Sequence, residues 1–111
     1  MLPSSLTLSP LLDMIAAQAG EADSNRFVSP EVISEIKNND IMRFTASESM
    51  GGLDQSCTRV GQELEAIAAA CSSTAWCLWN HLSTFHFFCG LLGPRHLDFL
   101  AGIVNKREWV C

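Results

Sequence analysis

The sequence predicts a single all-α domain of about five helices. Apolar residues recur at intervals of three and four along most of its 111 residues, and capping or breaking residues divide this pattern into segments. The run between Glu65 and Arg95 contains no Asp, Glu, Lys or Arg, so we expect its helix to be buried in protein or in lipid. A chain of this length builds one hydrophobic core.

The first two helices follow from spacing and caps. Apolar residues at helical spacing predict an amphipathic helix from Leu8 to within residues 20–23. Ser29 is an expected N-cap and Pro30 an expected first helical residue of a second, short helix. That helix should end at residues 38–40, Asn-Asn-Asp, because these side chains compete with the helical backbone for hydrogen bonds.

The middle of the chain predicts a connection and a third helix. Residues 41–44 are expected to be briefly extended and residues 51–52, Gly-Gly, to form a turn. Asp54 is the expected cap of the third helix, and an interruption is expected at residues 72–73.

The last elements are a long apolar helix and a shorter one. The fourth helix is expected over residues 74–91, and residues 93–94, Gly-Pro, should end it and begin the fifth. Residues 108–111 resemble the start of a strand, which needs a neighbour for its hydrogen bonds. We therefore expect residues 1–111 to be one helical domain, the N-terminal part of a larger protein, with 108–111 beginning a β-domain.

Composition excludes several functions. The formal net charge is −5, and the seven Lys and Arg residues are scattered, which argues against a nucleic-acid partner. The five cysteines form no C-x-x-C pair, so we expect mostly buried free thiols in the cytoplasm and no metal site. The N-terminus lacks the basic start of a signal peptide, and polar residues within the uncharged run oppose a membrane span.

Polar residues on the fourth helix form the candidate site. His81 is either a hydrogen-bonding partner or base beside a ligand, or a neutral histidine satisfied within the protein. His86 falls on another side of the helix, where it cannot share a site with His81. Trp76 and its aromatic neighbours can stack on a planar ligand, but aromatic residues at this spacing usually form core. The predicted stripe comprises Ser73, Cys77, Asn80, His81, Thr84 and Phe88.

Beyond these patterns, the order of several segments resembles a known family. The segments EADSNRFVSPEVISEIKNNDIMRF, ELEAIAAACSSTAW, GLLGPRHLDFLAGIV and EWVC are similar to the N-terminal helical domain of the acyl-CoA dehydrogenase superfamily, from about Leu8 to Cys111. The motif at 71–76, CSSTAW, resembles a signature of flavin-dependent monooxygenases, the oxygenase components of two-component aromatic hydroxylases. The family's usual proline and tyrosine before the glycine pair are absent from residues 45–50.

The resemblance implies a helical domain, a β-domain and a C-terminal helical domain assembled as a tetramer. Flavin, as reduced FMN from a partner reductase or as bound FAD, would be held mainly by the other domains. It implies a pocket wall on the fourth helix made of Ser73, Trp76, Cys77, Asn80, Thr84 and Phe88, with His81 as the catalytic candidate.

The leading hypothesis is thus the N-terminal domain of a flavin-dependent oxidoreductase that hydroxylates an aromatic substrate using oxygen. A second hypothesis is an acyl-CoA dehydrogenase that desaturates an acyl thioester. A third is a non-enzymatic helical module that binds a partner through its apolar fourth helix. A membrane-associated helical protein is the weakest alternative.

Overall fold

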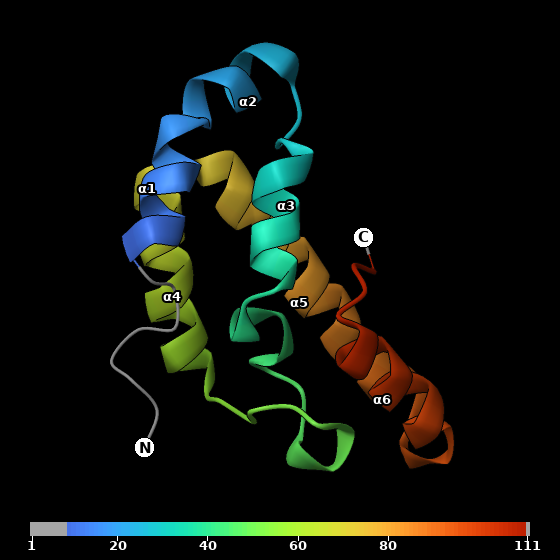
Figure 1. Ribbon diagram of the computed structural model, residues 1–111. Helices are drawn as coiled ribbons and strands as arrows, with labels where there is room; N and C mark the ends of the chain where they lie inside the picture. Colours follow the sequence, from blue (N-terminus) through green and yellow to red (C-terminus); the bar gives the residue numbers. More distant parts are fainter. Residues whose placement is uncertain (1–8, 111) are drawn as a thin grey trace.

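The computed structural model describes residues 9–110, and this part of the chain is helical and contains no strand (Figure 1). The all-α fold class is therefore confirmed, with six α-helices rather than about five. Short 3₁₀ helices lie between α3 and α4 and between α5 and α6. The α-helices are α1 (Ser9–Ala17), α2 (Ala19–Asn25), α3 (Pro30–Lys37), α4 (Cys57–Ala70), α5 (Ser72–Leu92) and α6 (Leu97–Lys106), and the 3₁₀ helices are η1 (Asp40–Arg43), η2 (Glu48–Met50) and η3 (Pro94–His96).

The prediction of one continuous first helix was wrong, because the chain bends at Gln18 between α1 and α2. The side chain of Gln18 accepts a hydrogen bond from the Ser29 hydroxyl and donates one to Glu31 at 3.2 Å, which ties the bend to the start of α3. The helix α2 then continues to Asn25 and ends at Arg26, whose φ of 63° is left-handed.

The second predicted helix is confirmed as α3. The Ser29 hydroxyl accepts from the backbone N–H of Val32, Pro30 occupies the first turn, and the helix ends at Lys37. Val32 and Ile36 are buried, so the inward face of this short helix belongs to the core.

Two predictions for the connection to α4 were wrong. Residues 41–44 are not extended, because Asn39 caps η1 and both Ile41 and Met42 turn into the core. Asp54 is not the cap of α4, since it has a left-handed φ of 50°, and Ser56 accepts from the N–H of Arg59 instead. The predicted glycine turn is confirmed, with Gly51 at φ 87°.

The long fourth helix of the prediction is confirmed as α5. The break before it falls at Cys71, whose backbone is extended, one residue earlier than expected. Gly93, with φ 69°, ends α5, and Pro94 then opens the turn into α6. Residues 108–110 have no strand partner in the described part of the chain, so the following β-domain stays a prediction, and Cys111 lies outside the described residues.

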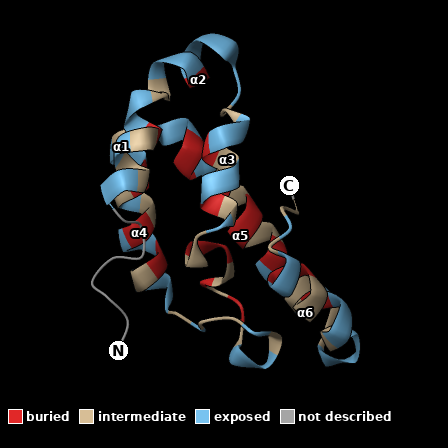
Figure 2. Ribbon diagram, viewed as in Figure 1, coloured by how far each residue is buried: buried red, intermediate tan, exposed pale blue. Residues whose placement is uncertain are grey.

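Two apolar clusters lie along α5 (Figure 2). The larger packs α1, α3, η1 and α4 against the first half of α5, and Leu78 is fully buried there. The smaller packs α6 against the second half through Phe85, Leu100 and neighbouring residues. Because α5 takes part in both clusters, it positions one half of the molecule relative to the other.

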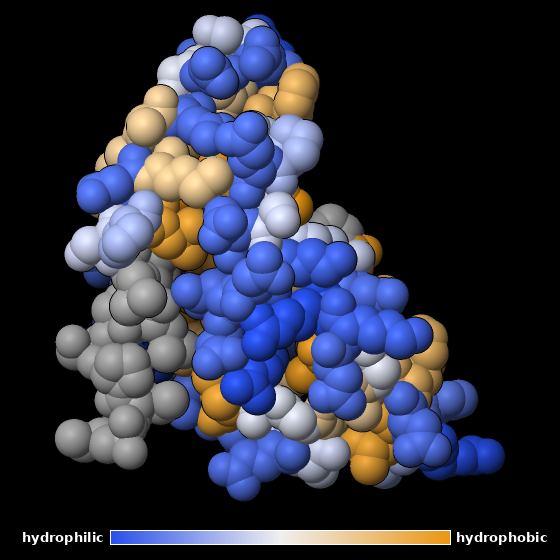
Figure 3. Space-filling model, viewed as in Figure 1, coloured by the Kyte–Doolittle hydropathy of each residue, from blue (hydrophilic) through white to orange (hydrophobic). Residues whose placement is uncertain are grey.

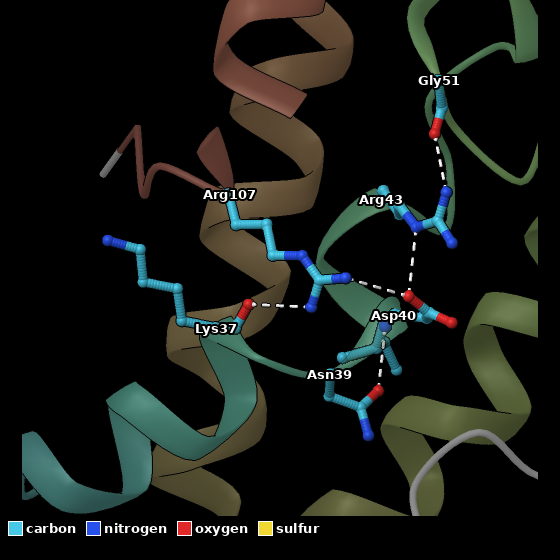
Figure 4. A network of polar contacts seen from close by, with 7 residues as sticks. Lys37, Asn39, Asp40, Arg43, Gly51 and Arg107 are labelled. Carbon is cyan, nitrogen blue, oxygen red and sulfur yellow. Dashed lines mark hydrogen bonds and ion pairs between the residues drawn. The ribbon is translucent and has the colours of Figure 1, made fainter. Parts of the chain in front are cut away.

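A polar network fixes α6 to the end of α3 (Figure 4). The Asp40 carboxylate accepts from Arg43 Nε at 3.1 Å and from Arg107 Nη2 at 3.2 Å. Arg107 also donates to the carbonyl of Lys37, and Arg43 donates to the carbonyl of Gly51. A single carboxylate thus joins η1, the glycine turn and the chain after α6.

We expect Asp40→Asn to lower the free energy of unfolding by about 1 kcal/mol, because both ion pairs lose their charge while the side-chain shape is kept. The effect should shrink at high salt, since this carboxylate is partly exposed. Urea unfolding measures it. Asp13→Asn, at an exposed position in the middle of α1, is the matched control, and equal losses in both variants would contradict this role for Asp40.

Among residues 9–110, no single helix is long and apolar enough to cross a membrane. Only Ser72–Leu92 and Pro94–Lys106 taken together are long and apolar enough for this. The chain bends by 108° between these two segments.

Candidate ligand pocket at the start of α5

A surface cavity of about 630 Å³ lies between the end of α2 and the first turns of α5. Three of the predicted site residues, Ser73, Trp76 and Cys77, lie on its α5 side. The full lining is Ala22, Asp23, Arg26, Phe27, Val28, Ser72, Ser73, Trp76 and Cys77.

Local backbone geometry creates this cavity. The left-handed residue Arg26 ends α2 and directs the next residues back toward α5. The extended residue Cys71 ends α4 and begins α5, so Ser72 and Ser73 occupy the first turn of a 21-residue helix. That turn carries no acidic residue and receives no cap from the Cys71 side chain. Its N–H groups and the helix dipole give this end of the cavity a positive potential.

The lining combines apolar surface with a few polar groups. Trp76 is 64% exposed and Phe27 is 60% exposed, so their rings form walls that still face solvent. Hydroxyl groups come from two serines, a thiol from Cys77, and opposite charges from Asp23 and Arg26. Such a lining suits one side of a planar, partly polar ligand, and flavin fits this description. The other side of that ligand would have to be covered by further protein.

The remaining stripe residues do not reach this cavity. Asn80 and Thr84 are half-buried farther along α5. Phe88 packs against the smaller apolar cluster, next to α6. The structure thus divides the predicted stripe between a cavity at one end and a core cluster at the other.

His81 is buried between these two ends, with 3% of its surface exposed. Its Nδ1 accepts a hydrogen bond from the Val110 N–H at 3.2 Å, and it also bonds with the backbone of Met42. The Trp109 ring lies edge-on at 5.3 Å between ring centres. Burial lowers the pKa of His81, and the bond to Met42 partly offsets this. This geometry is that of a neutral histidine satisfied within the protein, and a catalytic role for it stays a prediction.

A second cavity, of about 480 Å³, lies between α4 and the opposite side of α5. His86 lines it and is exposed, so the prediction that the two histidines face different sides is confirmed. The cavity is mostly apolar. Its lining is Thr45, Cys57, Val60, Gly61, Leu64, Trp79, Leu82, Ser83, His86 and Phe87.

The expectation that the aromatic residues of α5 are core was wrong for three of them. Phe85 is buried, but Trp76 and also Trp79 (45%) and Phe87 (68%) are exposed. The reason is that α4 packs on one side of α5 and α6 packs on its second half around Phe85, which leaves these three rings uncovered. Figure 3 shows apolar patches on an otherwise polar face, one of them at the α5–α6 end of the molecule.

The described cysteines form no disulfide, and their environments differ. Cys71 is buried as expected, Cys77 and Cys89 are half-buried, and Cys57 is exposed, which corrects the expectation for that residue. Burial raises the pKa of the Cys89 thiol, so it remains protonated at neutral pH. No group of three metal-ligating side chains occurs among residues 9–110.

The α2 side of the first cavity was missed by sequence reasoning. Asp23, Arg26 and Phe27 form it, and they lie about 50 residues before α5 in the chain. The available signal was the charged and aromatic run that follows the first apolar segment, directly before the Ser29 cap.

The fold and this cavity together define a class, an all-helical domain with a surface cavity at the start of its longest helix. The chain belongs to the acyl-CoA dehydrogenase family, because the family model described as acyl-CoA dehydrogenase, N-terminal domain, matches residues 11–89. Members of this family generally depend on flavin, bind acyl-CoA substrates and form oligomers. No curated protein and no solved structure matches the chain. The predicted superfamily is confirmed, and the monooxygenase branch stays a prediction.

Proposed function

We propose that this chain works as the N-terminal helical domain of a flavin-dependent oxidoreductase and that the start of α5 forms part of the substrate and flavin pocket. The observation that carries the proposal is the cavity lined by Ser73, Trp76 and Cys77 within the region that matches the family. The exposed ring of Trp76 offers a stacking surface, and the first turn of α5 offers unpaired N–H groups.

The finer proposal is hydroxylation of an aromatic substrate with reduced flavin and oxygen. It is supported by the CSSTAW sequence at residues 71–76, which opens α5 and supplies three of the cavity residues on that helix. Bound reduced flavin would supply the oxygen-activating chemistry. In this proposal, the residues of this domain orient the aromatic ring beside Trp76 and exclude water from it.

Desaturation of an acyl thioester is the second candidate, favoured by the family model that matches the chain. The mostly apolar cavity between α4 and α5 would then suit an acyl chain better than the first cavity does.

Two readouts on the protein isolated from its own cells distinguish these reactions. Oxygen uptake with enzymatically reduced FMN or FAD, stimulated by simple phenols, supports hydroxylation. Bleaching of protein-bound flavin by saturated acyl-CoA thioesters, without oxygen uptake, supports desaturation. Absence of both, in a protein shown to be folded, would contradict the oxidoreductase proposal.

We expect Trp76→Ala to raise the KM for the ligand stacked on it about fivefold, because an aromatic contact of about 1 kcal/mol is lost. The variant should keep its stability, since the ring is mainly exposed. Phe99→Ala is the matched control, an exposed aromatic on α6 that lines neither cavity. Steady-state kinetics measure the effect, and an equal change in both variants would contradict the placement of the site.

A further inference from the structure

The chain that follows α6 folds back onto the middle of α5 (Figure 1). Arg107 adopts a left-handed φ of 53° and ends α6, and the Glu108 N–H closes the turn on the carbonyl of Ile103 at 3.1 Å. Together with the ion pair from Arg107 to Asp40, this turn aims residues 108–110 at His81.

His81 is the point at which three segments meet. Its Nδ1 holds the Val110 N–H at 3.2 Å, and its hydrogen bond with the backbone of Met42 reaches η1. Its ring also packs against Trp109, at 5.3 Å, and Phe85, at 6.4 Å between ring centres. One imidazole therefore joins α5, η1 and the segment after α6.

The contact with Val110 depends on the protonation state of the imidazole. Nδ1 accepts a hydrogen bond only while it carries no proton. A proton on Nδ1 would bring two N–H donors, that of His81 and that of Val110, face to face with no acceptor between them. It would also place a positive charge at a buried position. The segment is also held with modest strength, because the Trp109 Nε1–H is buried with no hydrogen-bond partner among the described residues.

The charged groups on the surrounding segments do not favour a positive His81. On η1, Asp40 pairs with Arg43 and Arg107, and after α6 the next charged residue, Glu108, is exposed. The neighbouring positions of α5 carry the thiol of Cys77 and the hydroxyl of Thr84. Burial and the Met42 bond account for the shifted pKa of His81, and burial is the larger cause.

We infer that His81 is a pH-sensitive latch, whose neutral imidazole holds residues 108–110 on α5 and η1 and whose protonation releases them. The direction in which the chain leaves α6 then changes with pH. This device is independent of which reaction the protein catalyses.

The direction of the pH effect follows from the lowered pKa. Between that pKa and the ordinary value of 6.5, the released form binds more protons than the latched form. The latched form is therefore fully favoured above 6.5, loses stability as the pH falls through this window, and changes no further below the lowered pKa.

Fluorescence of Trp109 provides the first test. The protein has three tryptophans, so Trp76→Phe with Trp79→Phe leaves Trp109 as the single emitter. Between about pH 8 and about pH 5, its emission should shift to longer wavelength as the latch opens. Adding His81→Asn, whose side-chain oxygen still accepts a hydrogen bond but does not titrate, should abolish the shift. Adding His86→Asn, the exposed histidine of the same helix, should leave it unchanged.

Backbone exchange in the unaltered 111-residue chain tests the inference without relying on a variant that folds. The protection factor of the Val110 amide should fall at least tenfold over the same pH range, with the midpoint at which the His81 imidazole titrates by NMR. A Val110 protection factor that does not change as His81 titrates would overturn the inference. An emission shift that persists with His81→Asn would overturn it as well.

Discussion

Gly52→Ala is expected to lower the free energy of unfolding by about 3 kcal/mol. A Cβ atom at this position would lie 2.1 Å from the carbonyl oxygen of Ala46, which is backbone and cannot rotate away. The same carbonyl accepts a hydrogen bond from the Asp54 N–H. Relief of the clash would therefore break the backbone pairing that closes the connection between η1 and α4.

Gly61→Ala is the matched control for this substitution. A Cβ atom there meets nothing within 4 Å, and Gly61 lies inside α4. The control should raise stability by up to about 1 kcal/mol, because alanine favours the helix. Urea unfolding of both variants measures the difference. Two variants of similar stability would contradict the close approach at Gly52.

Arg59→Met should lower the free energy of unfolding by about 3 kcal/mol, because it removes the positive charge that opposes the buried carboxylate of Glu63. Glu63 is 2% exposed and lies 3.6 Å from Arg59 within α4. Arg59 also lies over the Phe44 ring, at 5.8 Å from its centre, and methionine keeps part of this apolar contact. The loss should therefore come mainly from the charge.

A double variant separates charge from packing. Adding Glu63→Gln to Arg59→Met should recover at least half of the lost stability, since the buried carboxylate is then neutral. Arg95→Met, at an exposed position in η3, is the control and should change stability by less than about 0.5 kcal/mol. A double variant no more stable than Arg59→Met would contradict the ion-pair account.

The elements that depend on local chemistry were predictable from the sequence. Ser29-Pro30 starts α3 and Gly93 ends α5 through contacts with residues at most a few positions away. Asp54 misled the prediction because its N–H donates to the carbonyl of Ala46 within the connection before α4, where the backbone of Asp54 is left-handed. With Asp54 held in this way, Ser56 is left to cap α4.

The candidate site was predictable only on one side, for the same reason. Ser73, Trp76 and Cys77 share one side of a helix, and helical spacing alone reveals this. The opposite wall at Arg26 depends on the bend at Gln18 and on tertiary packing, which spacing does not encode. The core role of Phe88 likewise requires α6 to fold back beside it.

Native mass spectrometry of the protein captured from its own cells, supplied anaerobically with reduced FMN or FAD, tests whether this chain is the helical domain of a flavin-dependent oxidoreductase. We expect a chain several times heavier than 12.1 kDa that binds one flavin per chain. A folded chain of 12.1 kDa that binds no flavin would contradict it. In that case, the exposed aromatic side of α5 would be the place to search for a protein partner.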